Sequence, residues 1–170
     1  MPVAYLDCIA MPTASALFDS ALNQLAGHRP SSQNGYSSWA PCDSVGAFLV
    51  GLRNVIEARG RVVLVFDKAE RLAARGASHS LLDTLIELPN LYAAAAAARA
   101  QHRGSDAVSV ATAAAGAVLP VFVGESLWPD FQRICEGDAR VLHFRFQGYP
   151  MDSLCTVLKR DVDVALPENS

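Results

Sequence analysis

The sequence lacks a glycine-rich phosphate-binding loop, paired cysteines and a surplus of basic residues. None of its 11 glycines is followed by lysine, so the G-x-x-x-x-G-K-[ST] loop of P-loop nucleotide-binding proteins is missing. The four cysteines form no C-x-x-C pair and have no histidine at metal-ligand spacing, which argues against a zinc site and favours reduced cysteines in the core. The net charge of -3, from 14 basic and 17 acidic residues, does not indicate nucleic-acid binding. We therefore expect that this chain alone does not bind a nucleoside triphosphate tightly, and that any contact with DNA would come from a local patch or from partners.

A targeting or membrane-spanning segment is also not expected. Residues 1–7 lack the basic region and long apolar stretch of a signal peptide. Residues 107–124 carry no formal charge, but six of these 18 residues are alanine and Pro120 interrupts the stretch, so it is only weakly hydrophobic. The sequence predicts an intracellular protein that makes no contact with a membrane.

The apolar content is enough for one core but is inflated by alanine. Apolar residues make up 51% of the chain, but 28 of these residues are alanines. Of the alanines, 13 lie between residues 93 and 117. With only 18% charged residues, the chain does not have the composition of a disordered protein. We expect one domain over residues 1–170. Within it we expect residues 93–117 to form an alanine-rich surface insertion, separate from the core, helical at 92–101 and flexible elsewhere.

Short apolar runs alternate with helical stripes along the chain. The runs VVLVF at 62–66 and VLPVFV at 118–123 show no polar alternation, which is typical of parallel strands buried on both faces. Strands are also predicted at 3–9 and, with alternation, at 141–146. The helices between them predict an α/β fold with a parallel sheet of about four strands and helices on both faces. The predicted helices are one from Thr13 to Gly27, one from Asp43 or Ser44 to Gly60, one at 80–88 that Pro89 breaks, a short one opened by Pro129, and a brief one near Leu154.

Asp67 is the first candidate for a functional residue, because it follows a buried strand directly. Ligands of doubly wound sheets bind at the carboxyl ends of the strands, and an acid there can hold Mg²⁺ against nucleotide phosphates. The run V-V-L-V-F-D is therefore similar to a Walker B strand. The same aspartate can also serve only to cap the helix that follows it.

The ten residues 63–72, V-L-V-F-D-K-A-E-R-L, resemble the Walker B region of the origin recognition complex subunit 5 family, whose members typically read D-K-A-E there. Weaker matches keep the same order along the chain: S-L-W at 126–128 after a strand, and G-Y-P at 148–150 after an aromatic strand. The resemblance covers about residues 3–160, apart from the alanine-rich segment. It implies a partial AAA+ core, which is a P-loop NTPase-like fold.

The resemblance also implies roles for residues. Asp67 would be the Mg²⁺-side acid, and Asp67 and Glu70 would be the residues nearest to bound ATP, with Glu70 on the following helix. Lys68 stands where AAA+ ATPases keep the glutamate that activates water, and Gly124 stands at the usual sensor position, so hydrolysis is not expected. Arg133 lies where such proteins often reach a neighbouring subunit, although a solvated helix face explains it equally well. ATP and Mg²⁺ are expected for the family, but the missing loop argues against their binding here.

The implied function is that of a non-catalytic subunit of the origin recognition complex, in the nucleus. Its partners would be the other subunits of that complex, and through them origin DNA and helicase loading in the initiation of DNA replication. Against the AAA+ pattern, the first strand, the P-loop and the following helix are missing before residue 3, and the lid and winged-helix regions are missing after Ser170. We expect a fragment, a truncated gene model or splice form, or a diverged paralogue. Two alternatives stay open: a small ATPase of another AAA+ or P-loop lineage, and an α/β protein-interaction module in which Asp67 only caps a helix.

Overall fold

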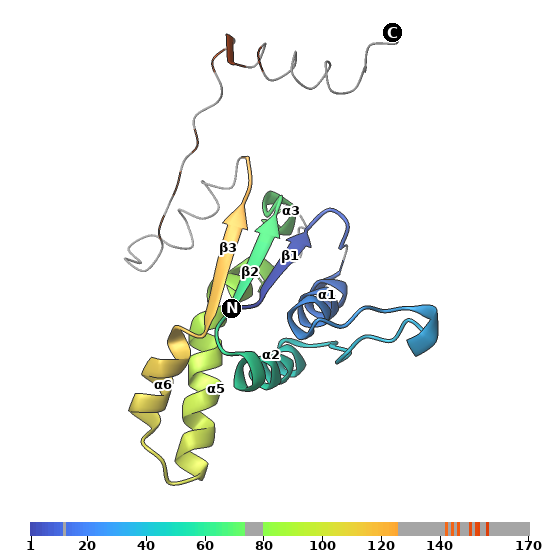
Figure 1. Cartoon of the computed structure of the whole chain (residues 1–170). Coiled ribbons are helices and arrows are strands. Elements are labelled where there is room, and N and C mark those ends of the chain that lie inside the picture. Colours follow the sequence, from blue (N-terminus) through green and yellow to red (C-terminus); the bar gives the residue numbers. More distant parts are fainter. Residues whose placement is uncertain are drawn as a thin grey trace. The chain divides into compact units, whose positions relative to one another are not determined.

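Three parallel strands and the helices between them make up the fold (Figure 1). A computed structural model of the chain describes residues 1–11, 13–73 and 80–125, together with a few single positions between 142 and 156. The chain divides into two units, Met1–Glu136 and Gly137–Ser170, and the fold belongs to the first. In chain order its elements are β1 (Val3–Asp7), α1 (Ala14–Ala26), the 3-10 helix η1 (Ser32–Asn34), α2 (Val45–Arg59), β2 (Val62–Asp67), α3 (Glu70–Ala73), α4 (Ser80–Ile86), α5 (Leu88–His102), α6 (Ala107–Ala115) and β3 (Val118–Val123).

The sheet has the order β1-β2-β3, so the strand with the D-K-A-E sequence at its end is the central one. Both neighbours pair with β2 in parallel, and the register places Tyr5 beside Val65 and Val65 beside Val121. Three of the predicted strands are therefore confirmed, together with the α/β class. The fourth, at 141–146, falls largely outside the described residues, as do the helices predicted after Pro129 and near Leu154.

The helix ends follow the capping signals of the sequence. The side chains of Thr13 and Ser44 each accept the backbone N–H of the residue three positions later, at the starts of α1 and α2. Gly27 ends α1 with a φ of 72°, in the left-handed region that glycine adopts without strain. Gly60 ends α2. The predicted limits of these two helices are confirmed.

Pro89 starts a helix, whereas the sequence suggested only that it ends one. The preceding helix α4 stops at Ile86, and α5 begins at Leu88 with the proline in its first turn. A proline costs little there, because the first N–H groups of a helix have no partner within it. The helix predicted at 92–101 is thus part of a longer one.

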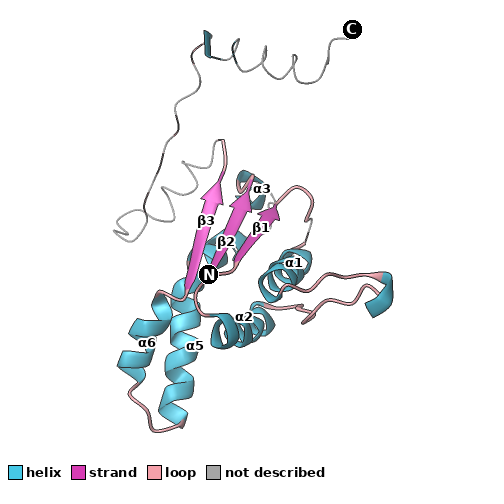
Figure 2. Cartoon of the chain, in the orientation of Figure 1, coloured by secondary structure: helices cyan, strands magenta, loops and turns pink. Residues whose placement is uncertain are grey.

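The alanine-rich residues form a helical hairpin of α5 and α6 (Figure 2). Four of its alanines, at positions 93, 96, 114 and 117, belong to the hydrophobic core. The expectation of a segment separate from the core, flexible outside 92–101, is therefore wrong. The small alanine side chains let α5 and α6 pack closely, and this packing brings some of them into the core. That residues 93–117 are an insertion relative to a family pattern stays a prediction.

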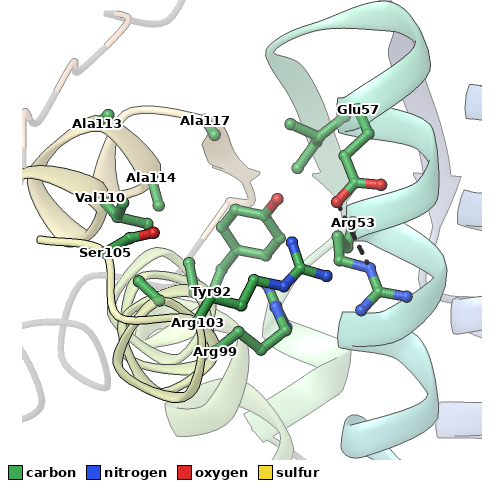
Figure 3. Close-up of a pocket in the computed structure, with 13 residues that line it drawn as sticks. Arg53, Glu57, Tyr92, Arg99, Arg103, Ser105, Val110, Ala113, Ala114 and Ala117 are labelled. Carbon is green, nitrogen blue, oxygen red and sulfur yellow. Dashed lines mark ion pairs between the residues drawn. The ribbon is translucent and has the colours of Figure 1, made fainter. Parts of the chain in front are cut away.

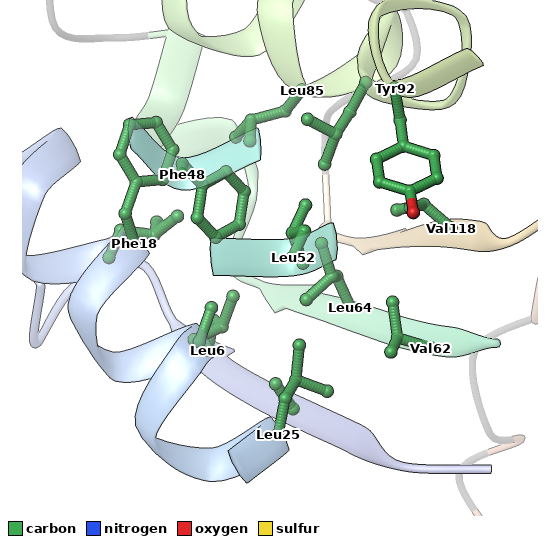
Figure 4. Packing of buried hydrophobic residues seen from close by; sticks show 14 of the residues in the cluster. Leu6, Phe18, Leu25, Phe48, Leu52, Val62, Leu64, Leu85, Tyr92 and Val118 are labelled. Atoms are coloured by element: carbon green, nitrogen blue, oxygen red, sulfur yellow. The ribbon is translucent and has the colours of Figure 1, made fainter. Parts of the chain in front are cut away.

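The core lies on one face of the sheet, where alternate strand residues meet the helices (Figure 4). Leu6, Leu64 and Val118 come from the three strands and are at most 2% exposed. Phe18 of α1 stacks on Phe48 of α2, with ring centroids 4.4 Å apart. The helices contribute further buried side chains, among them Leu17, Leu22, Leu25, Leu52, Val55, Leu85, Leu88 and Tyr92.

The other face of the sheet is apolar and open. We call it the open face and define it by Val3, Tyr5, Val63, Val65, Leu119, Val121 and Val123. The two outer strands expose these side chains by 37–55%, and Val63 in the central strand is shielded by its neighbours at 8%. The strands follow one another in a single direction, so right-handed connections place every intervening helix on the same side. Within the described ranges, helices therefore cover one face of the sheet, and the expected second layer is not seen there.

Both outer edges of the sheet carry a feature that disfavours further strand pairing. At β1, the side-chain amide of Gln24 bonds the backbone of Tyr5. At β3, the carbonyl of Ala117 accepts from Val62, so by alternation the backbone nitrogen of Pro120 points away from β2. Proline has no N–H to offer a further strand at that point. Such devices are typical of strands that end a sheet.

Candidate functional site

Asp67 lies where the sequence placed it, at the carboxyl end of the central strand β2. The register puts Asp7 of β1 directly beside it and Val123 of β3 on its other side. Two acids thus meet at the edge of the sheet where ligands of parallel α/β proteins bind. The topology confirms this place for Asp67 and adds Asp7, which the sequence did not single out.

The carboxylate of Asp67 is already engaged by the protein. The phenol of Tyr5 donates a hydrogen bond to its Oδ2, and the backbone N–H of Lys68 donates to its Oδ1 at 2.9 Å. The hydrogen bond to Asp67 raises the pKa of the Tyr5 phenol, with smaller contributions from burial and from the negative charges of Asp67 and Asp7. Since Asp67 bonds Lys68 and Tyr5, and not an N–H of the first turn of α3, the capping role gains no support.

Asp7 is held by its own turn. Its Oδ1 accepts the backbone N–H of Ile9 at 2.8 Å, and its carbonyl accepts that of Met11 at 3.2 Å. The side chain therefore stabilises the exit from β1. The Asp7 carboxylate already accepts a hydrogen bond within its own turn, and a metal ion would have to compete with that hydrogen bond.

Lys68 and Glu70 follow Asp67 in a sharp turn from strand to helix. Lys68 has a φ of 54°, in the left-handed region that non-glycine residues rarely adopt, and its side chain is exposed. Glu70 begins α3 as expected, and its Oε2 is shielded from solvent and has no hydrogen-bond partner among the described residues. No hydrogen bond joins Glu70 to Asp67, so the two predicted site residues are near in sequence but do not form one cluster.

These residues do not fit a Mg²⁺–ATP site as they are arranged. Between residues 1 and 125, leaving aside position 12 and 74–79, no group of three or more histidine, cysteine or acidic side chains could hold a metal ion. Magnesium can be held by one or two carboxylates when a phosphate supplies further oxygens, but a phosphate needs a cradle of N–H groups. The sequence lacks the loop that would form this cradle, and the Asp67 carboxylate already accepts a hydrogen bond from the Tyr5 hydroxyl.

The described cysteines are structural. The side chains of Cys8 and Cys42 are buried, as predicted, and Cys135 and Cys155 lie outside the described residues. Burial raises the pKa of Cys42, and the charges of Asp19 and Asp43 add to the effect. A thiol held in its protonated form is a poor nucleophile, so the structure offers no cysteine chemistry at this position.

The sequence did not single out Tyr5, whose hydroxyl donates a hydrogen bond to the carboxylate of Asp67. The two residues are 62 positions apart, and only the parallel pairing of β1 with β2 brings them together. Arg133, a further residue considered for the site, and the S-L-W match at 126–128 lie outside the described residues. Gly124 directly follows β3, as predicted.

No helix among the residues that can be placed is long and apolar enough to cross a membrane. The chain matches no protein-family model. No curated protein matches it either.

Proposed function

We propose that this protein is a non-catalytic subunit of a multi-protein assembly of the origin recognition type, acting in the nucleus in the initiation of DNA replication. The proposal starts from the D-K-A-E sequence at 67–70, which follows the central strand of a parallel sheet. A Walker B strand occupies such a place in P-loop-like folds. The α/β architecture is compatible with a partial AAA+ core.

The observation that carries the proposal is the open face. Soluble monomers rarely leave large contiguous apolar surfaces uncovered, and such surfaces mark sites of protein association. Here Tyr5 of β1 and Leu119 and Val121 of β3 stand on the two strands that flank β2, and each is exposed by more than a third. Because both sheet edges disfavour strand pairing, a partner would dock on the face itself, and an apolar helix surface of a neighbouring subunit is the occupant that suits it.

The absence of catalysis rests on three features of the acid site. The Tyr5 hydroxyl engages Asp67, an exposed lysine follows at position 68, and no glycine is followed by a lysine that could bind phosphates. A protein with this site would serve the assembly by its contacts. Origin DNA would then be bound through the complex, consistent with the chain's net charge of -3.

The proposal is tested by capture of named partners. The tagged full chain is incubated with nuclear extract, and the other origin recognition subunits are detected with specific antibodies. The variant Val121→Asp places a charge in the open face, whereas the matched control Val108→Asp places one on α6 at a residue that is 76% exposed. We expect Val121→Asp to abolish capture and Val108→Asp to retain it, with thermal unfolding unchanged in both.

Three results would count against the proposal. The wild-type chain could recover none of the origin recognition subunits. Val121→Asp could lower the unfolding temperature by several degrees without affecting capture, which would mean that residues of this same chain cover the face. ATP hydrolysis by the purified chain, lost in Asp67→Asn, would show an ATPase instead of a non-catalytic subunit.

A further inference from the structure

A cavity of about 420 Å³ lies between α2, α5 and α6, away from the acid site (Figure 3). One of its lining residues, Ala117, directly precedes β3 and bonds the first residue of β2, so the cavity is at the amino end of the sheet. Asp67 is at the opposite end of the same strand. The cavity is therefore independent of the site discussed above.

Positive charge is in excess around this cavity. Arg53, Arg99 and Arg103 line it, with Glu57 as the acid among the lining residues. Glu57 forms an ion pair with Arg53, with 3.7 Å between its Oε1 and the Arg53 Nε. In the part of the chain that is described, Arg99 and Arg103 have neither an ion-pair nor a hydrogen-bond partner. Two guanidinium groups thus remain without a counter-charge.

The spacing of the two free arginines argues for a ligand. Residues four apart share one side of a helix, and like charges in that arrangement repel each other. A cation near the last turn of α5 suits the helix dipole, but this interaction does not require two arginines at the wall of a cavity. Figure 3 shows Arg99 and Arg103 extending from the α5 side towards the part of α2 that carries Arg53. A bound anion would attract both guanidinium groups and so offset their mutual repulsion.

The remaining walls combine the hydroxyl groups of Tyr92 and Ser105 with an apolar surface. Tyr92 is 5% exposed and lines the cavity. Burial is the main cause that raises the pKa of Tyr92, against the opposing charges of Arg99 and Arg53, so its O–H stays protonated and can donate. Small apolar side chains from α5, α6 and the residue before β3 also line the cavity: Ala96, Ala100, Val110, Ala113, Ala114 and Ala117.

We propose that this cavity binds a small organic phosphate monoester. The dianionic phosphate would match the two unpaired charges of Arg99 and Arg103, because guanidinium groups bind phosphate oxygens through paired N–H donors. Arg53 and the Tyr92 hydroxyl complete the donor set, and the apolar part of the ester lies along the alanine wall. The volume is within the range of cavities that hold small molecules.

Calorimetric titration of the full chain with phenyl phosphate tests the proposal. Inorganic phosphate serves as the probe without an apolar part, and benzyl alcohol as the probe without charge. We expect saturable binding of phenyl phosphate, weaker binding of inorganic phosphate and none of benzyl alcohol. The double variant Arg99→Gln/Arg103→Gln should bind phenyl phosphate at least about tenfold more weakly, as expected for the loss of charge-assisted hydrogen bonds.

Two further variants keep the test decisive. Arg71→Gln removes an exposed arginine of α3, outside the cavity, and should bind as the wild type does. Ala113→Phe alters an exposed residue and fills the cavity while every arginine remains, so it should abolish binding without lowering the unfolding temperature. Equal weakening in Arg71→Gln, undiminished binding in Ala113→Phe, or equal affinity for inorganic phosphate would each overturn the proposal.

Discussion

The side chain of Gln24 pairs with the backbone of Tyr5 as a neighbouring strand would. Its Oε1 accepts the Tyr5 N–H at 2.8 Å, and its Nε2 donates to the Tyr5 carbonyl at 2.8 Å. Helix α1 thereby satisfies the outer edge of β1 at the residue whose phenol bonds Asp67. The same tyrosine links the first helix, the sheet edge and the acid site.

Replacing Gln24 with leucine should lower the free energy of unfolding by about 1 kcal/mol, because two backbone groups of β1 would have only water as partners. Urea unfolding followed by circular dichroism measures the change. The matched control is Gln101→Leu, at an exposed position near the end of α5. Equal losses in the two variants would mean that the Gln24 pairing contributes nothing to stability.

The Tyr5–Asp67 hydrogen bond should make stability fall at alkaline pH. The pKa of Tyr5 is raised in the folded protein, so the protonated phenol is favoured by folding. This contribution is fully present below the ordinary tyrosine pKa of about 10 and is lost as the pH rises through the raised value. Urea unfolding between about pH 8 and 11 should show the loss in the wild type and not in Tyr5→Phe.

Tyr36→Phe serves as the control for this pH dependence, since Tyr36 is 72% exposed. Tyr92 also has a raised pKa, but it is present in both proteins and cancels in the comparison. Ultraviolet absorbance of the phenolate gives an independent measurement of the Tyr5 titration. If Tyr5→Phe and the wild type lose stability in parallel as the pH rises, the hydrogen bond has no such effect.

Two glycines of α2 should respond in opposite ways to alanine. A Cβ at Gly51 would clash with the Cδ1 atom of the fully buried Leu22, whereas one at Gly46 would meet nothing within 4 Å. Alanine is favoured over glycine in helices by about 1 kcal/mol, and overpacking a core costs about 1–3 kcal/mol. Gly46→Ala should therefore stabilise the protein, and Gly51→Ala should destabilise it by up to about 2 kcal/mol. Thermal unfolding of the two variants measures both effects. Stabilisation by Gly51→Ala would show that the Leu22 side chain moves aside at no cost.

Lys68→Gly should stabilise the chain by about 0.5–1 kcal/mol, because glycine adopts the left-handed conformation of this turn without steric strain. Chemical denaturation measures the difference. Lys68→Ala, which removes the same charge and keeps the Cβ, is the control and should give no gain. A gain of equal size in both variants would assign the effect to charge and not to the backbone.

The sequence predicted best the features that depend on neighbouring residues. Thr13, Ser44 and Gly60 mark helix ends through short-range hydrogen bonds and backbone preferences, and the apolar run at 118–123 coincides with β3. Asp67 could be placed because a strand and its end are both visible in the sequence. The alanine-rich residues were misjudged, since composition does not reveal which alanines face a partner helix.

Features that depend on pairing between distant segments could not be predicted. The Tyr5 hydroxyl reaches Asp67 only because β1 lies beside β2, and Arg53 and Arg99 line one cavity only because α2 and α5 both border it. The open face was hidden for the same reason. A continuous apolar run such as 62–66 suits a strand covered on both sides, and its sequence does not record which side another segment will cover.

The sheet edges and the open face together determine how copies of this protein would associate with one another. Pro120 and Gln24 disfavour the addition of strands, which is the step by which sheets grow into fibrils. Stacking of the apolar faces is not blocked, and two sheets packed in this way lie about 10 Å apart. Concentrated solutions without a partner should therefore contain face-to-face dimers or amorphous precipitate and no dye-binding fibrils.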